Sequence, residues 1–286
     1  MSLLVLALVG GAAIAHATWN VAIKRAGTSG PGLLWLSFIV GTVVFLPFGV
    51  WSLLDSGVDL ANWLGLAVVS GALQIVYFFL LQRGYRNADV SVVYPLARGT
   101  GPLLTVLFAM ILFGERPGPI ALAGAGLVIA GVVVTGLAGG RSGSADNRAG
   151  ILYGLAIGIL IAVYTLWDSA AVTVGGMPAV GLYWGSVLFQ FLLLAPAGLR
   201  SPARLVATAR GHWATILIVG VLAPLAYIIV LIAFQLAPVS IVAPAREVSV
   251  VLVGLAGWLF FHEPHPARRL VGAGIVLAGI ALLAVG

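Results

Sequence analysis

Two arginines at corresponding places in the two halves of the chain are the residues best suited to do chemistry. Arg98 lies in the apolar stretch "VVYPLARGTGPLL" and Arg246 in "IVAPAREVSVVL", and each follows a proline by two or three residues. Proline removes a backbone N–H and frees a carbonyl one turn earlier, while arginine stays charged and offers paired donors to an anion. The pattern predicts an anion-binding site. The alternative is a pair of structural ion pairs, Arg98 with Asp168 and Arg246 with Glu247.

Polar residues four positions apart mark one face of two further stretches. His16 and Asn20 lie in "HATWNVAIK", and Tyr164 and Asp168 hold the matching places in the second half; a spacing of four keeps side chains on one helix face. Asp168 is the first candidate for proton coupling, because a carboxylate can lose its charge and an arginine cannot. Glu247 and His16 are the other candidates, although a lone helical histidine is more often a packing residue.

Aromatic residues near these groups complete the predicted site. The predicted substrate-binding residues are Arg98, Tyr94, Asp168, Arg246, His16, Asn20, Trp19, Tyr77, Tyr164, Trp167 and Tyr227, with Gln74, Tyr183, Trp184 and Gln190 as further polar or aromatic groups inside apolar runs. Glu115 closes an apolar run and is expected to be structural or gating. The sequence offers no catalytic motif, metal site or cofactor fingerprint, so an enzyme is not expected.

Composition places these residues in a membrane. The chain of 286 residues is 62% hydrophobic and 8% charged, whereas a soluble domain carries about 25% charged residues. The formal net charge of +6 does not indicate nucleic acid, because the basic residues lie singly between apolar runs. There is no cysteine and hence no disulfide framework. The lipid bilayer is the predicted environment.

Ten apolar runs are long enough to cross a bilayer, which takes about 20 residues. They cover roughly 3–23, 32–54, 63–82, 90–112, 118–138, 150–171, 178–197, 213–236, 239–261 and 267–285. The polar stretch 139–148 is predicted to be a linker between five spans on each side. Four tryptophans near span ends are expected at the membrane interfaces, namely Trp51, Trp63, Trp213 and Trp258.

The two sets of five spans resemble each other. "GAGLVIAG" at 124–131 matches "GAGIVLAG" at 272–279, "ADVSVVYPLAR" at 88–98 matches "APVSIVAPAR" at 237–246, and Glu115 matches Glu263. An odd number of spans per repeat makes the second repeat enter the membrane in the opposite sense. The expected fold is therefore an all-α polytopic membrane protein with ten helices in two inverted five-helix repeats, 1–138 and 149–286, and the site at their interface.

The chain also resembles a known family. Trp19-Asn20 followed by Lys24, together with "FGERP" at 113–117, look like the EamA proteins of the drug/metabolite transporter superfamily. The resemblance implies a secondary transporter, usually an exporter of amino acids or other small metabolites. It implies a central cavity lined mainly by spans 1, 3, 4, 6, 8 and 9. A flippase for a lipid-linked metabolite, also known in the superfamily, is the alternative.

Basic residues in the connections predict the orientation. Lys24, Arg25, Arg83, Arg86, Arg141, Arg148, Arg200, Arg204, Arg210, Arg268 and Arg269 lie in odd-numbered connections, and Arg116 alone in an even one. The odd connections are therefore predicted in the cytoplasm and both termini outside, in a bacterial inner membrane. The small-residue faces of 118–138 and 267–285 are suited to close packing, either within the fold or in a homodimer. The expected partners are a small-molecule substrate and protons.

Overall fold

The chain folds into a bundle of helices, as the composition predicts. The computed structural model describes residues 1–27, 30–137, 147–261 and 266–286, and these contain helices and no strand. The helices are α1 (Leu3–Ala26), α2 (Pro31–Ser56), α3 (Leu60–Asn87), α4 (Val90–Leu112), α5 (Pro119–Leu137), α6 (Asn147–Thr173), α7 (Ala179–Gly198), α8 (Pro202–Leu236), α9 (Val239–Ala245), α10 (Val248–Phe261) and α11 (Pro266–Val285). Among the described residues, ten stretches are long and apolar enough to span a membrane, and α9 and α10 share one, Val239–Phe260. Most of the predicted linker and Glu263 lie outside the described residues.

Local sequence explains where several helices begin and end. The Ser2 side chain accepts a hydrogen bond from the Val5 N–H at the start of α1, and Asp59 accepts one from Asn62 at the start of α3. Such caps satisfy backbone donors that the first turn leaves free. Gly27 and Gly57 follow α1 and α2 with φ of 64° and 62°, a conformation that glycine adopts without steric cost.

The two proline-containing spans differ in their backbone. In the second half the span is interrupted at Arg246 and Glu247, where the Glu247 N–H bonds to the Pro244 carbonyl at 2.9 Å, only three residues back. In the first half α4 continues through Pro95 and Pro102. The proline before the arginine thus accompanies an interrupted helix in the second half and a continuous helix in the first.

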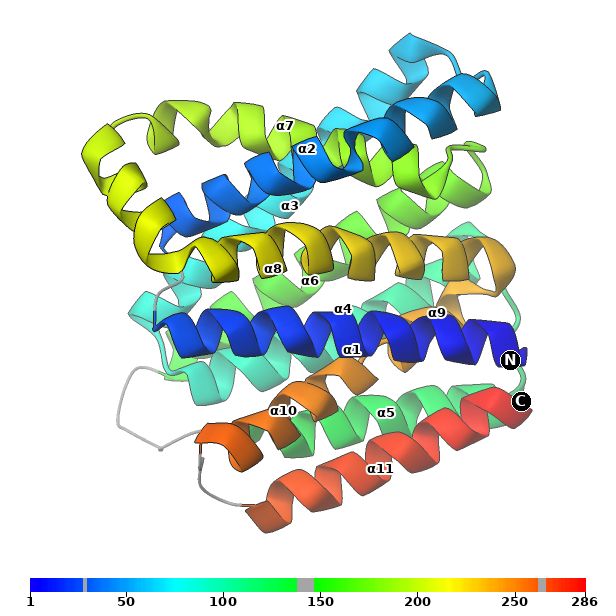
Figure 1. Ribbon diagram of the computed structural model, residues 1–286. Coiled ribbons are helices and arrows are strands. Elements are labelled where there is room, and N and C mark those ends of the chain that lie inside the picture. Colours follow the sequence, from blue (N-terminus) through cyan, green and yellow to red (C-terminus); the bar gives the residue numbers. More distant parts are fainter. Residues whose placement is uncertain (28–29, 138–146, 262–265) are drawn as a thin grey trace.

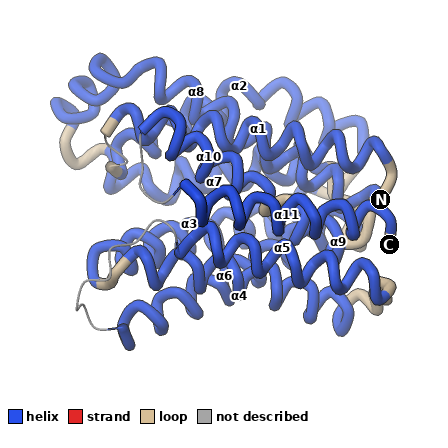
Figure 2. The backbone as a smooth tube through the Cα atoms, turned by 90° about the horizontal axis from the view of Figure 1, so that it is seen from below, coloured by secondary structure: helices blue, strands red, loops and turns tan. Residues whose placement is uncertain are grey.

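Helices from the two halves interleave. α1 packs on α8, α2 on α7 and α8, α3 on α6 and α7, and α4 on α6, so most close neighbours come from opposite halves. α5 and α11 lie side by side in Figures 1 and 2. A Cβ at Gly279 would lie 2.7 Å from the Gly124 carbonyl oxygen, and one at Gly131 would lie 2.7 Å from that of Gly272. The small-residue faces thus pack on each other within the chain, and a homodimer would have to use other surfaces of these helices.

Both termini lie at one end of the bundle (Figure 1), and buried apolar side chains fill that end. Its buried residues include Val5 and Val9 of α1, Phe234 of α8 and Val239 of α9. Here the Glu115 carboxylate, beyond the end of α4, accepts hydrogen bonds from the backbone N–H groups of Val239 and Ser240 at 2.7 and 2.8 Å. Glu115 thus ties the first half to the start of α9, the structural role expected of it.

Of the four tryptophans expected at the membrane interfaces, two are exposed, Trp258 is half-buried and one is buried. Trp51 and Trp213 have exposed fractions of 66% and 64%, as residues in contact with lipid or interface would. Trp63 is buried, stacks on Trp184 at 5.7 Å, and donates its indole N–H to the Gly181 carbonyl. The expectation that Trp63 lies at the membrane interface is wrong, because the α3–α7 contact covers the ring.

Candidate functional site

A cavity of about 500 Å³ lies between the interleaved halves. Residues of α1, α2, α3, α4, α6, α7, α8 and α10 line it, together with Arg246 and Glu247 from the interruption before α10. The cavity extends to Leu34 near the start of α2 and Tyr85 near the end of α3, which is the end of the bundle opposite the termini (Figure 1). α2 and α7 take part in addition to the spans that the family resemblance implied.

The charged residues that line the cavity are two arginines and one glutamate. Arg98 Nη1 lies 3.6 Å from Glu247 Oε2, and Arg246 Nε lies 3.5 Å from Glu247 Oε1. Arg246 also donates to the Thr165 hydroxyl at 3.2 Å, and the Arg98 guanidinium lies 5.8 Å from the centre of the Tyr94 ring. The cluster leaves one positive charge in excess, which favours an anionic ligand. The predicted pairing of Arg98 with Asp168 is wrong, because Glu247 is the carboxylate that Arg98 meets.

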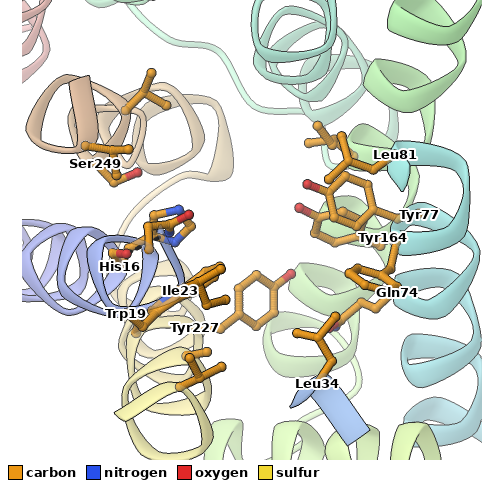
Figure 3. A pocket seen from close by; sticks show the side chains of 18 of the residues that line it. His16, Trp19, Ile23, Leu34, Gln74, Tyr77, Leu81, Tyr164, Tyr227 and Ser249 are labelled. Carbon is orange, nitrogen blue, oxygen red and sulfur yellow. Dashed lines mark hydrogen bonds between the residues drawn. The ribbon is translucent and has the colours of Figure 1, made fainter. Parts of the chain in front are cut away.

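Four tyrosine rings from α3, α6, α8 and α7 form a continuous row that reaches across the cavity. Tyr77 lies 5.6 Å from Tyr164, Tyr164 lies 6.2 Å from Tyr227, and Tyr227 lies 4.7 Å from Tyr183. Figure 3 shows Tyr77, Tyr164 and Tyr227 directed toward the space that His16 faces from α1. Aromatic rings with polar tips offer an amphipathic ligand both apolar contact and hydrogen bonds.

The predicted polar face of α1 lines the cavity opposite Tyr77 and Tyr164 (Figure 3). The rings of His16 and Trp19 meet edge to face at 5.0 Å. Asn20 uses its amide within the helix, donating to the His16 carbonyl at 2.8 Å. The Trp19 indole nitrogen is buried and has no hydrogen-bond partner. Since a buried donor without a partner is costly, Trp19 is suited to donate a hydrogen bond to a bound ligand.

Asp168 lies behind the cavity wall at the centre of a hydrogen-bonded network. Its Oδ2 accepts from the Tyr227 hydroxyl at 2.8 Å and from the Gln74 amide at 3.2 Å. The Gln74 carbonyl oxygen in turn accepts from Tyr183 and Gln190. Asp168 has an exposed fraction of 0%, and its Oδ1 has no hydrogen-bond partner. The network therefore links a fully buried acid to the cavity through Tyr227 and Gln74.

The structure brings nine of the eleven predicted site residues to the cavity. The nine are Arg98, Tyr94, Arg246, His16, Asn20, Trp19, Tyr77, Tyr164 and Tyr227. Asp168 and Trp167 do not line it, and Trp167 donates its indole N–H to the Leu66 carbonyl at 3.2 Å. Gln74, Tyr183 and Gln190, noted as further polar groups, also line it, as do Gln82 and Tyr85, which the sequence did not single out. Both lie toward the end of α3, where polar residues are common and carry no distinct signal.

Metal chemistry finds no support in the part of the chain that the structure describes. No three histidine or acidic side chains among those residues gather closely enough to hold an ion. The groups that face the cavity are arginines, tyrosines, amides and one glutamate, which are suited to bind and release an organic molecule.

The EamA-like transporter family model matches residues 3–137 and again residues 148–285. The chain belongs to this family. It is also 30% identical over 264 residues to an uncharacterised protein of Pseudomonas aeruginosa, covering 81% of this chain and 86% of that one. A multidrug transporter of the same organism is 42% identical over 78 residues, 27% of this chain and 69% of its own length.

Two further similarities concern a flippase subunit and a solved structure. A probable 4-amino-4-deoxy-L-arabinose-phosphoundecaprenol flippase subunit of Klebsiella pneumoniae is 43% identical over 49 residues, which is 17% of this chain and 44% of that subunit. A protein of known crystal structure superposes with a TM-score of 0.77 at 22% identity, covering 98% of this chain and 96% of that one. This last likeness shows the fold alone.

The EamA-like chain is accordingly an integral membrane transporter and not an enzyme. Its family and the named relatives with a stated activity are transporters or flippases. These findings confirm the predictions of family, all-α membrane fold and transport.

Proposed function

We propose that the chain carries a small amphipathic metabolite with an anionic group, such as an amino acid, across the membrane. The observation that carries the proposal is the pair of guanidiniums, Arg98 and Arg246, which face a cavity lined mainly by aromatic, apolar and uncharged polar groups and leave one positive charge in excess over Glu247. Arginine recognises carboxylates through paired donors. Ionisable groups inside membrane spans are costly and as a rule functional.

We propose alternating access between two inverted repeats, 1–138 and 149–286, as the mechanism. The double match of the family model supports the repeat. The packing supports it too. α1 and α6 are the first spans of their halves, and α3 and α8 are the third spans. α1 packs on α8, and in the same way α6 packs on α3, so each first span contacts the third span of the other half. The second spans of the two halves, α2 and α7, pack on each other, and so do the fifth spans, α5 and α11.

The proposed orientation has both termini outside and the odd-numbered connections in the cytoplasm of a bacterial inner membrane. In that orientation the cavity, which extends to Leu34 and Tyr85, approaches the cytoplasm, while Glu115 and the packed core close the outer end. A cavity that loads from the cytoplasm supports export as the direction. Asp168, Glu247 and His16 are the candidates for proton coupling, and Asp168 has the strongest case because its hydrogen-bond partners are uncharged.

Replacement of Arg98 tests the proposed cargo. A panel of amino acids and aryl carboxylates is first screened for thermal stabilisation, and the best ligand is used for uptake into proteoliposomes. At substrate concentrations below the wild-type Kd, Arg98→Ala should reduce uptake by about tenfold to a hundredfold, because loss of a charged donor weakens carboxylate binding by that factor. Glu247 keeps Arg246 as its counter-ion in this variant, so the protein should remain monodisperse.

Arg204→Ala is the matched control, since it removes an exposed arginine at the start of α8. Uptake by this variant should equal that of the wild type. Unchanged transport by well-folded Arg98→Ala would remove Arg98 from the site.

A flippase for a lipid-linked metabolite is the second candidate. The similarity to the Klebsiella flippase subunit over 49 residues favours it. The same proteoliposomes can test for flippase activity if they contain a fluorescent polyprenyl-phosphate-linked sugar whose movement between leaflets is measured. Movement of this lipid between leaflets, without binding of any soluble anion, would replace the proposed cargo with a lipid-linked one.

A further inference from the structure

We infer that Glu247 is an internal competitor for the anionic group of the cargo. In the structure its carboxylate lies between Arg98 and Arg246, in the place that the cargo's carboxylate takes when it binds. The inference rests on the proposed anionic cargo and adds the residue that sets the affinity and charge selectivity of the site.

The geometry of the cluster shows that Glu247 holds both arginines loosely. Its two oxygens lie 3.6 Å from Arg98 Nη1 and 3.5 Å from Arg246 Nε. Charge-assisted N–H···O bonds are shorter, about 2.7–2.9 Å. Glu247 Oε2 has no hydrogen-bond partner although the side chain is only 2% exposed. A single carboxylate that meets two cations at these distances offsets one of the two positive charges and leaves the donors of both guanidiniums incompletely used.

Both guanidiniums also have neutral partners, which stay in place when the cargo's carboxylate replaces that of Glu247. Arg246 donates to Thr165 on α6, and Arg98 lies over the Tyr94 ring one turn earlier on α4. The arginines are therefore held for a ligand by groups other than Glu247. A site whose donors are positioned in advance binds its ligand with less loss of entropy.

Glu247 also lies at a break in the regular helix of its span. It follows α9 in the turn before α10, where the N–H groups of Glu247, Ser249 and Val250 each bond to a carbonyl three residues back. Arg98, by contrast, lies within the continuous helix α4. Displacement of Glu247 requires adjustment of this turn alone and leaves α4 intact.

The other buried acid near the cavity provides a contrast. Asp168 is also fully buried, but its Oδ2 accepts from Tyr227 and Gln74 and it forms no ion pair within 4.0 Å of either arginine. Removing the Asp168 charge alters the field in the cavity without freeing a guanidinium. Comparison of the two acids therefore separates direct competition from a general change in charge.

The test measures binding to detergent-solubilised full-length protein by isothermal titration calorimetry. The probes are 3-phenylpropionate and its neutral analogue 3-phenylpropionamide. If Glu247 occupies the anion site about nine-tenths of the time, Glu247→Gln should bind the carboxylate about tenfold more tightly. Its affinity for the amide should stay unchanged. Asp168→Asn should raise carboxylate affinity by less than Glu247→Gln does.

Glu247→Asp keeps the test decisive if the glutamine variant does not fold. The shorter side chain keeps its charge but cannot meet both arginines, so its carboxylate affinity should lie between those of the wild type and Glu247→Gln. Equal or weaker carboxylate binding by the Glu247 variants, or an equal gain for the amide, would overturn the inference while leaving the anionic cargo in place. Failure of the wild type and all variants to bind the carboxylate would overturn both.

Discussion

Asp168 is the residue at which coupling of transport to protons can be tested most directly. Its carboxylate is fully buried and bonded to Tyr227 and Gln74, and the nearest charged group of the cavity, Arg246, is paired with Glu247. An ionised side chain inside a membrane costs at least about 2.5 kcal/mol. Asp168 can avoid that cost by taking up a proton, which none of the arginines can do.

Asp168→Asn should therefore uncouple transport from protons without removing substrate binding. In proteoliposomes, an imposed pH gradient should accelerate transport by the wild type, while the variant should respond only to the substrate gradient. Gln74 and Tyr227 can still bond to an asparagine oxygen, so the variant should fold. A full response to the pH gradient in Asp168→Asn would assign coupling to Glu247 or His16 instead.

The same residue shows how far the sequence predicts the site. Tyr164 and Asp168 are four positions apart, and four residues of an α-helix turn through slightly more than one full revolution. That small rotation places Tyr164 in the cavity wall and Asp168 behind it, against Gln74 of α3 and Tyr227 of α8. The sequence identified nine residues that line the cavity among the eleven it predicted, mainly because they are ionisable or aromatic residues inside apolar runs. It could not identify Glu247 as the ion-pair partner of Arg98, because that depends on contact between α4 and the interrupted span.

Among the elements, the α5–α11 pair makes the sharpest prediction about stability. A Cβ at Gly279 would lie 2.7 Å from both the Gly124 carbonyl oxygen and the Val128 nitrogen. Gly279→Ala should destabilise the protein by roughly 1–3 kcal/mol, a cost typical of overpacking. The midpoint of thermal unfolding in detergent should fall by several degrees.

Gly274 provides the matched control on the same helix. A Cβ there would meet nothing within 4 Å, and alanine is favoured over glycine in a helix by up to about 1 kcal/mol. Gly274→Ala should leave the midpoint unchanged or raise it. A similar fall for both variants would mean that helix packing at Gly279 is not the cause.

The sequence predicts that these helices exist better than it predicts which surfaces they contact or where they are interrupted. The repeated "GAGLVIAG" and "GAGIVLAG" segments indicated close packing, but nothing in either segment says which surface it meets. Likewise Pro95 and Pro244 precede the two arginines, yet α4 continues and the other span breaks. Whether a helix continues through a proline or is interrupted there depends on the neighbouring contacts. Those contacts form only in the folded bundle.

For the whole molecule, the ten predicted spans match ten apolar helical stretches among the described residues, because bilayer thickness fixes the length of apolar sequence that a span needs. The orientation stays a prediction from the positions of Lys and Arg. Single cysteines can test it, because the chain has none of its own. Ser56 at the end of α2 and Ser201 before α8 are both exposed serines, and the two connections lie at opposite ends of the bundle (Figure 1).

Ser56→Cys should react with a membrane-impermeant maleimide on intact cells, and Ser201→Cys should react only after lysis. The reason is that the connection after α7 carries Arg200 and Arg204, and positive charge is retained on the cytoplasmic side. The substitutions are matched in size and exposure, so a difference in labelling reports the side of the membrane. The reverse pattern would place both termini in the cytoplasm, and the cavity that extends to Leu34 and Tyr85 would then load from outside, making uptake rather than export the direction to test.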